Sequence, residues 1–184
     1  MDAATWRTTR LSACHLSRSL LPLLGQPLST LFGNSLPTDD RVGTMAMLAA
    51  YCGLRRAEIA RVHRRDLVGE ELLIRGKGGK VRAVPVTSFE LLRRLDCAVD
   101  WLFPNGQGDH LTPGHVGRLL SAAMPEGWTA HTLRHRMASV SYAGTRDLLA
   151  VGAVLGHSRP ETTQRYIRLP DDALRAAVRA ASAA

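Results

Sequence analysis

Six side chains in this sequence carry groups that can bind, polarise or attack a phosphate. They are two arginines, two histidines, one lysine and one tyrosine: Arg55, Lys77, His131, Arg134, His157 and Tyr166. The last four follow one another between residues 131 and 166, at intervals of 3, 23 and 9 residues. Together these residue types predict chemistry at a phosphodiester, in which a DNA strand is cut and rejoined.

A phosphodiester resists nucleophilic attack because its two non-bridging oxygens are negatively charged, so a catalyst must supply fixed positive donors. Arginine suits this purpose, since its guanidinium stays protonated and binds two oxygens at once. His131 and Arg134 lie three residues apart in a predicted helix and project from one face, while Arg55 comes from a separate helix. Two arginines and two imidazoles could therefore surround one phosphate without a metal ion. The sequence shows no carboxylate cluster or His/Cys ligand set that would bind one.

Tyr166 and Lys77 supply the nucleophile and the proton. The phenol of Tyr166 can attack phosphorus to form a covalent phosphotyrosine, which conserves the bond energy for rejoining. Lys77 lies in the glycine-rich turn GKGGK. With an ordinary pKa of about 10.4 it is protonated at neutral pH, so it can protonate the leaving 5′ oxygen as a general acid. Glu58 is assigned a supporting role, orienting Arg55 or its helix, because a carboxylate beside the phosphate would repel it.

The remaining histidines are assigned to packing or surface roles: His15, His63, His110, His115 and His135. Each motif is weak when taken singly, since a lone H-x-x-R or a basic hairpin turn occurs in many proteins. The conjunction of all of them in one chain carries the prediction.

Composition and charge point to a polyanionic partner. The chain of 184 residues is 45% hydrophobic and 22% charged, with a formal net charge of +8. Residues 55–82 hold nine Lys or Arg against four Asp or Glu, and residues 131–168 hold six against two. Excess Lys and Arg gain free energy by displacing counterions from phosphates. The positive charge is thus concentrated on the two segments that carry the predicted chemistry.

The cysteines and the hydropathy indicate the cellular compartment in which the protein is expected to act. Cys14, Cys52 and Cys97 have no metal-binding spacing and form no even-numbered framework, which fits a reducing compartment. No apolar run approaches the roughly 18 residues of a membrane span. We expect a soluble cytoplasmic protein that acts on DNA.

The early elements can be predicted from local signals. Residues 44–52 form an apolar helix that Gly53 caps in a left-handed conformation. A second helix is expected from about Arg56 to Val62, with Ile59 and Val62 facing inward. Two β-rich runs, ELLIRG and VRAVPV, flank the GKGG turn and predict a β-hairpin that presents Lys77.

The later part of the chain reads as a series of helices after an irregular segment around residues 101–108. Thr112 and Pro113 mark the start of one helix, with inward residues Val116, Leu119 and Leu120. Three further segments are predicted to be helices. The first, residues 129–144, is closed by Gly144, and the second, residues 145–156, is closed by Gly156. The third, residues 161–167, presents Tyr166. A last helix is expected over residues 171–182. The fold class is mostly α with a small antiparallel β-sheet.

The organisation predicted is one domain with a lead-in. Residues 3–38 contain no Asp or Glu and include Pro22, Pro27 and Pro37, which break any long helix. We therefore expect residues 1–38 to be a poorly ordered or truncated lead-in. Residues 39–184 would then form the catalytic domain.

The motifs GLRRAE, GKGGKVRAVP, HTLRH, LGHS and TTQRY, in this order and spacing, resemble those of the tyrosine recombinase (phage integrase) family. The resemblance covers about residues 40–170 and implies the mostly helical catalytic-domain fold of that family. It also implies which residues activate the phosphate and which one attacks it: Arg55, Lys77, His131, Arg134 and His157 for activation, and Tyr166 as nucleophile.

The resemblance further implies how such a protein works. Members act without metal or nucleotide cofactor on double-stranded DNA, forming a 3′-phosphotyrosyl link and releasing a 5′ hydroxyl. They exchange strands pairwise in a tetramer, in which the C-terminal helix docks on a neighbouring protomer. Residues 171–182 could fill that role. The sequence leaves open whether a directionality factor is needed and which DNA site is used.

The sequence departs from the family pattern in two places. Members normally carry a separate helical core-binding domain before the catalytic one, and residues 1–34 are too short to be that domain. The chain is then either a catalytic fragment or a minimal or decayed member. Arg136 also stands where a small residue is common in the second arginine motif.

The leading interpretation is a site-specific recombinase, such as a phage or mobile-element integrase. Two alternatives remain: relaxation of supercoils by the same chemistry, as in a type IB topoisomerase, and a non-catalytic DNA-binding remnant. The final residues AASAA resemble a bacterial C-terminal degradation signal, and the alternative reading is the fraying end of an Ala-rich helix.

Overall fold

The computed structural model describes residues 40–157. Its helices and strands follow in this order: α2 (Asp40–Tyr51), α3 (Arg56–Ala60), η2 (Arg64–Asp66), β1 (Leu67–Val68), β2 (Glu71–Arg75), η3 (Lys77–Gly79), β3 (Val81–Pro85), α4 (Phe89–Asp96), α5 (Pro113–Ala123), α6 (Ala130–Thr145) and α7 (Leu148–Leu155). Several predictions lie outside the described residues: those for the lead-in 1–38, the segment 161–167 with Tyr166, the helix 171–182 and the ending AASAA.

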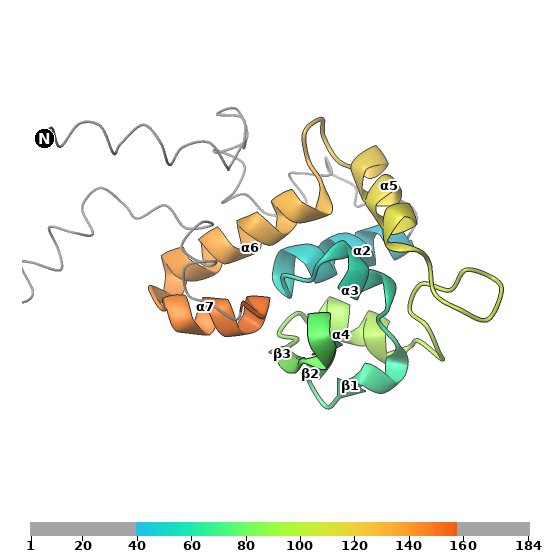
Figure 1. Cartoon of the computed structure of the whole chain (residues 1–184), viewed down its shortest axis with the longest axis horizontal. Coiled ribbons are helices and arrows are strands. Elements are labelled where there is room, and N and C mark those ends of the chain that lie inside the picture. The colour runs from blue at the N-terminus through green and yellow to red at the C-terminus, as the bar shows by residue number, and fades with distance from the viewer. Residues whose placement is uncertain (1–39, 158–184) are drawn as a thin grey trace, which may run out of the picture.

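The predicted fold class is confirmed, because helices dominate the described chain and one small antiparallel sheet accompanies them (Figure 1). β2 and β3 form the predicted hairpin, with Leu73 paired to Ala83. The two-residue strand β1 adds a third, unpredicted strand in the order β1-β2-β3. At the hairpin turn, Gly78 and Gly79 adopt positive φ of 77° and 75°, a conformation that glycine takes at little cost.

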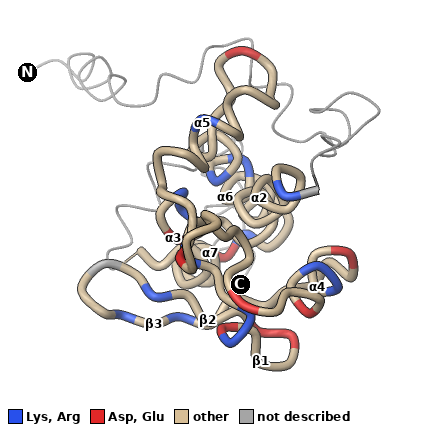
Figure 2. The backbone as a smooth tube through the Cα atoms, turned by 90° about the vertical axis from the view of Figure 1, so that its right-hand side faces the viewer, with Lys and Arg blue, Asp and Glu red and all other residues tan. Residues whose placement is uncertain are grey.

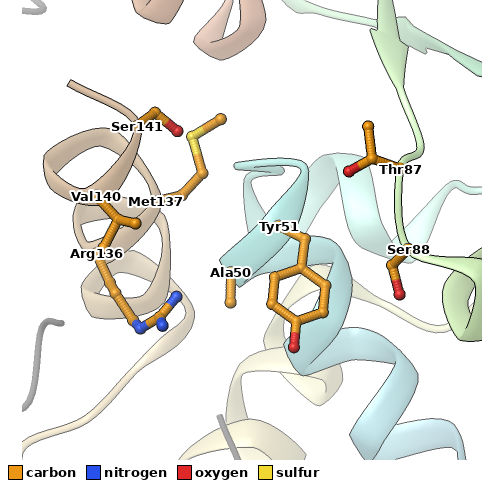
Figure 3. Close-up of a pocket in the computed structure, with 8 residues that line it drawn as sticks. All are labelled: Ala50, Tyr51, Thr87, Ser88, Arg136, Met137, Val140 and Ser141. Atoms are coloured by element: carbon orange, nitrogen blue, oxygen red, sulfur yellow. The ribbon is translucent and has the colours of Figure 1, made fainter. Parts of the chain in front are cut away.

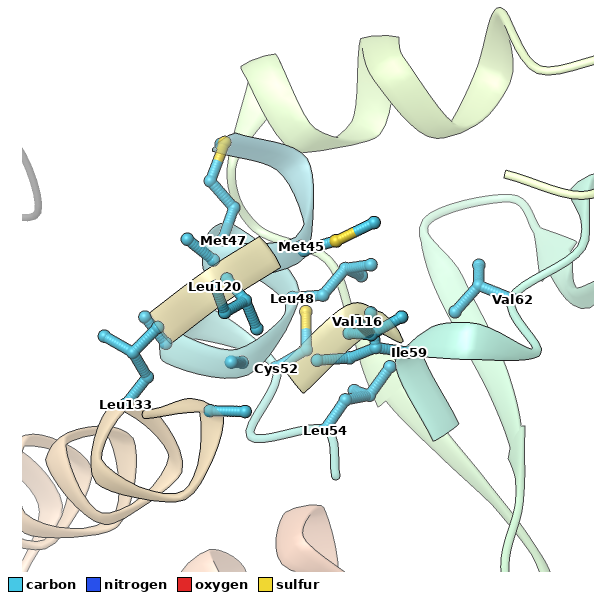
Figure 4. Packing of buried hydrophobic residues seen from close by; sticks show 14 of the residues in the cluster. Met45, Met47, Leu48, Cys52, Leu54, Ile59, Val62, Val116, Leu120 and Leu133 are labelled. Atoms are coloured by element: carbon cyan, nitrogen blue, oxygen red, sulfur yellow. The ribbon is translucent and has the colours of Figure 1, made fainter. Parts of the chain in front are cut away.

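α2 is the central helix of the molecule. It begins at Asp40, four residues before the predicted start, and ends at Tyr51. Side chains of α2, α3, α5 and α6 meet in one core, in which Leu48 and Leu120 are fully buried (Figure 4). Gly53 has φ +64°, so the predicted left-handed cap is confirmed.

The neighbours of α2 follow the predicted pattern with shifted ends. α3 stops at Ala60 instead of Val62, although Ile59 and Val62 are both buried as expected. α5 starts after Thr112, whose hydroxyl accepts a hydrogen bond from the backbone N–H of His115. The sequence analysis missed α4, an amphipathic helix whose apolar side is buried in the core.

α6 and α7 pack against each other and project beside the main body (Figure 1). The prediction that Gly144 closes α6 is wrong, because the helix continues to Thr145 and Arg146 adopts the left-handed conformation with φ 56°. The side chain of Asp147 caps α7 immediately afterwards, which places the turn at Arg146. α7 ends at Gly156 with φ +65°, as predicted. No helix within residues 40–157 is long and apolar enough to cross a membrane.

Candidate active site

Arg55 and Glu58 bind each other at the start of α3. Arg55 has an extended backbone and directly precedes the helix. One carboxylate oxygen of Glu58 accepts the Arg55 backbone N–H at 2.8 Å, and the other accepts Nη1 of Arg55 at 2.9 Å. The Arg55 side chain is 45% exposed and that of Glu58 only 6%. The guanidinium therefore reaches solvent while the carboxylate lies buried against it.

Arg82 of β3 completes this group, which we call the Glu58 cluster (Arg55, Glu58 and Arg82). Its Nη1 and Nη2 each donate to one oxygen of Glu58 at 2.9 Å. Its Nε donates to the carbonyl of Val154 in α7 at 2.8 Å. The sequence analysis did not single out Arg82. Its one local signal is a charged residue within the apolar strand VRAVP, which indicates a partner elsewhere in the fold.

The two arginines keep Glu58 ionised. Burial by itself would raise the pKa of the Glu58 carboxyl. The hydrogen bonds from Arg82 and from the Arg55 backbone, together with both positive charges, outweigh burial and hold this pKa below its usual value. The Glu58 cluster therefore carries two positive charges and one negative charge.

Arg134 of α6 lies deeper, at 2% exposure. Its guanidinium donates to the carbonyl of Gly53 and, at 2.7 Å, to that of Leu155. Nη2 also lies 3.1 Å from Nε2 of His157. Since a guanidinium has no acceptor, that Nε2 must accept, and a neutral His157 ring carries its proton on Nδ1. Arg134 thus joins the end of α2 to the end of α7.

The histidines of the site are biased toward the neutral form. Burial lowers the pKa of His157 to about 4, helped by the positive charges of Arg134, Arg55 and Arg82. Burial and the charges of Arg134 and Arg55 also lower the pKa of His131. The charges of Arg134 and Arg55 act on both rings, which indicates that these four side chains lie near one another.

His135, assigned to packing from the sequence, is buried and contacts His131. The two Nε2 atoms lie 2.9 Å apart, and the rings meet edge to face with centroids 4.3 Å apart. Burial lowers the pKa of His135 to about 4, with the charges of His131, Arg134 and His157 acting in the same direction. One of the two Nε2 atoms must carry the shared proton.

The other described histidines have structural contacts. His63 and His110 both contact Trp101 edge to face, with ring centroids 4.8 Å and 5.0 Å from that of the indole. His63 also pairs with Asp100 at 2.5 Å. The backbone N–H of His115 donates to Thr112 in the first turn of α5.

The structure brings four of the six predicted side chains together, from three parts of the fold: Arg55 before α3, His131 and Arg134 in α6, and His157 after α7. Lys77 begins the turn between β2 and β3, and its backbone but not its side chain is described. Tyr166 lies outside the described residues, nine positions after His157. Basic residues also lie around the hairpin of β2 and β3, where Arg75 ends β2, Lys80 directly precedes β3 and Arg82 lies within it (Figure 2). Among residues 40–157, no group of three or more His, Cys, Asp or Glu could hold a metal ion.

Arg136, which the sequence analysis expected to be unusual at its position, lines a cleft elsewhere on the molecule. It is 7% exposed and lines a cleft of about 480 Å³ between α2, the link from β3 to α4, and α6 (Figure 3). Tyr51 and Ser88 face it from the other side of this cleft. Residues two apart on a helix point in different directions, so the side chains of Arg134 and Arg136 do not share one face of α6.

Comparison with known proteins shows which family the sequence and the fold resemble. A family model described as the phage integrase family matches residues 27–172. The chain is 38% identical to the tyrosine recombinase XerC of Rhodospirillum centenum, over 62% of this chain and 38% of the relative. It is 34% identical to the tyrosine recombinase XerD of Rhizobium meliloti, over 73% of this chain and 49% of the relative. The chain thus spans less than half the length of either relative.

Among solved structures, the fold is similar to that of the XerH site-specific recombinase bound to its difH substrate in a pre-cleavage complex. The TM-score is 0.61 at 26% sequence identity, and the match covers 79% of this chain and 49% of the XerH chain.

Proposed function

Because the chain belongs to the phage integrase family of tyrosine recombinases, we propose that it is a site-specific DNA recombinase that acts through a 3′-phosphotyrosyl intermediate. Its substrate would be double-stranded DNA. The relatives named above are recombinases, and XerH is bound to a DNA site, which supports this choice.

The observation that carries the proposal is the meeting of Arg55, Arg134 and His157 from three separate elements. Attack on a phosphodiester builds negative charge on the non-bridging oxygens, and fixed guanidinium groups stabilise that charge. The imidazoles of His131 and His157 are biased toward neutrality. They can therefore donate hydrogen bonds to the phosphate without adding repulsion against the arginines.

The reaction we propose conserves the phosphodiester bond energy. The Tyr166 phenol attacks phosphorus, a bond from Oη to phosphorus forms, and the bond to the 5′ oxygen breaks. The ammonium of Lys77 gives its proton to that leaving oxygen, and the phenolic proton of Tyr166 passes to solvent water. In the second half, a 5′ hydroxyl attacks the phosphotyrosine and returns its proton to Lys77, the bond from Oη to phosphorus breaks, and Tyr166 takes up a proton from water as the DNA strand is restored. The arginines supply the charge that a metal ion supplies in other phosphoryl-transfer enzymes, so we propose that none is needed.

We further propose that the active form is a homo-oligomer, a tetramer on DNA, in which residues 171–182 pack on a neighbouring protomer. Two paired DNA sites must be held together for strands to be exchanged, which a single protomer cannot do.

The experiment that tests the proposal uses duplexes with a randomised central segment and a nick near its middle, labelled at the 5′ end of the nicked strand. Cleavage next to the nick releases a short fragment, so rejoining fails and the covalent adduct accumulates. We expect a labelled band that resists detergent in the wild-type protein and is absent in Tyr166→Phe. Tyr142→Phe is the matched control, because Tyr142 lies in α6 and is not one of the six side chains.

The outcomes separate the alternatives. Sequencing the trapped DNA identifies the site, and two copies of it on one plasmid should then recombine. Relaxation of supercoiled plasmid without joining of sites would favour the topoisomerase alternative. Binding of the duplexes without any adduct would overturn the proposal in favour of a DNA-binding remnant.

A further inference from the structure

The buried carboxylate of Glu58 is shared by two arginines with different surroundings. Arg82 binds both of its oxygens and has a side chain only 13% exposed. Arg55 binds one of them through its side chain and is 45% exposed. A fork-to-fork pair such as that of Arg82 and Glu58 is the stronger arrangement. Arg82 is therefore the main partner of the carboxylate, and Arg55 the accessible one.

The ion pair between Arg82 and Glu58 determines how much of the positive charge of Arg55 is offset by the carboxylate. With Arg82 in place, the Glu58 cluster carries a net charge of +1. Without Arg82, the charges of Arg55 and Glu58 would cancel, and the carboxylate would hold the Arg55 guanidinium with both oxygens. A neutral pair stabilises a phosphate much less than a net cation does.

Arg82 also determines the course of the chain before His157. Its Nε donates to the carbonyl of Val154 at 2.8 Å. A Cβ added to Gly156 would lie 2.9 Å from Cδ of Arg82, so the chain passes directly against this side chain. One side chain of β3 thus contacts both α3 and the end of α7.

We propose that Arg82 is a positioning residue for strand transfer: it takes up the charge of Glu58, so that Arg55 stays cationic toward the phosphate, and it holds the segment that leads to His157. This inference rests on the proposed recombinase activity. Arg82 itself need not touch DNA.

The test measures the single-turnover rate of adduct formation on nicked duplexes, with the full chain at saturating concentration. We expect Arg82→Met to lower this rate by about tenfold. Removal of a direct transition-state donor lowers a rate by more, ~10²–10³-fold. The double variant Arg82→Met/Glu58→Gln restores the net charge of +1 and should recover part of the rate. Arg82→Lys keeps the charge without the fork and should fall in between.

The matched control is Arg75→Met, which removes an equal charge from the same hairpin. The Arg75 side chain is 63% exposed and lies 3.4 Å from Asp66, outside the Glu58 cluster. Circular dichroism confirms that each variant is folded. A double variant as slow as Arg82→Met, or a rate for Arg82→Met equal to that of Arg75→Met, would overturn the proposal.

A second readout does not depend on recognition of DNA. Orthovanadate mimics the pentacoordinate phosphate, and its binding can be followed by the NMR signals of the arginine Nε–H groups. Arg82→Met should weaken vanadate binding, and the double variant should restore it. If the wild type forms no adduct but these shifts are seen, the recombinase proposal fails, while the effect of Arg82 on the charge that Arg55 offers to an anion is still supported. Equal vanadate binding by wild type and Arg82→Met would contradict that role.

Discussion

Arg134 shows how one residue can serve both the fold and the chemistry. Its guanidinium donates to two backbone carbonyls, of Gly53 and Leu155, and to the ring of His157. A buried carbonyl left without a donor costs about 1–3 kcal/mol. We therefore expect replacement of Arg134 to change stability as well as the proposed catalysis.

Arg134→Lys tests this double role. A single ammonium cannot reach both carbonyls and the ring, so we expect the free energy of unfolding to fall by roughly 2 kcal/mol, about one lost partner. Urea unfolding followed by circular dichroism measures this change. Arg61→Lys, at the residue directly after α3, is a matched control, because Arg61 is exposed. Equal unfolding midpoints for the two variants would show that the buried contacts of Arg134 contribute nothing to stability.

The histidines predict a dependence of stability on pH. The pKa of His135 and that of His157 are lowered to about 4 in the folded chain, against an ordinary value of about 6.5 when unfolded. Between these values the unfolded state binds more protons, so the free energy of unfolding must decrease as pH falls from about 6.5 to 4. Above that window the two histidines add no pH dependence.

Thermal unfolding at a series of pH values measures this effect, and His135→Gln should make the dependence shallower. Parallel curves for wild type and His135→Gln would contradict the view that the buried ring is held neutral.

At the scale of elements, the caps of the helices position the site. Gly53 follows α2 with φ +64°, and its carbonyl accepts from Arg134. A Cβ at this position would lie 2.8 Å from Leu155 and 3.1 Å from Met137. Position 53 therefore favours glycine for two reasons: its backbone is left-handed, and side chains of α6 and α7 approach it too closely for a Cβ.

Gly53→Ala and Gly69→Ala form a matched pair. Gly69 has a similar φ of +61° but nothing within 4 Å of an added Cβ. We expect Gly69→Ala to cost only the left-handed strain of about 1–2 kcal/mol. Gly53→Ala should cost a further ~1–3 kcal/mol from overpacking. Equal losses of unfolding free energy for the two variants would show that the approach of Leu155 to Gly53 is not tight.

The elements also show which parts of the fold could be predicted from the sequence. The hairpin, the start of α5 and the caps at Gly53 and Gly156 have strong local signals, and the structure confirms them. β1 has only two residues and no periodicity to detect. The Gly144 prediction failed because the cap of the next helix, at Asp147, determined where the turn lies.

The same distinction applies to the site. Residue types, spacing and the order of the motifs predicted six side chains, of which Arg55, His131, Arg134 and His157 belong to the described residues and lie near one another. Arg82 was missed because its partners Glu58 and Val154 lie 24 and 72 residues away. No local pattern encodes contacts at that separation, and only the packing of β3 against α3 and α7 reveals them.

At the scale of the whole molecule, the net charge of +8 predicts how DNA binding responds to salt. If roughly six or more phosphates are neutralised, affinity should fall about 10³-fold or more between ~50 and ~200 mM salt. Fluorescence anisotropy with a labelled duplex measures the slope. Tyr166→Phe should bind with the same slope, since it removes no charge, whereas a salt-independent affinity would contradict an electrostatic mode of binding.

In the proposed reaction, Tyr166 forms a bond to the 3′ phosphate of a cut DNA strand. The most direct test is mass spectrometry of the trapped adduct after digestion by protease and nuclease. The chain contains only three tyrosines, Tyr51, Tyr142 and Tyr166, so the modified peptide identifies the nucleophile without ambiguity. We predict a nucleotide joined through its 3′ phosphate to the peptide that contains Tyr166, with a free 5′ hydroxyl on the other DNA end. Attachment to Tyr51 or Tyr142, or through a 5′ phosphate, would contradict the account.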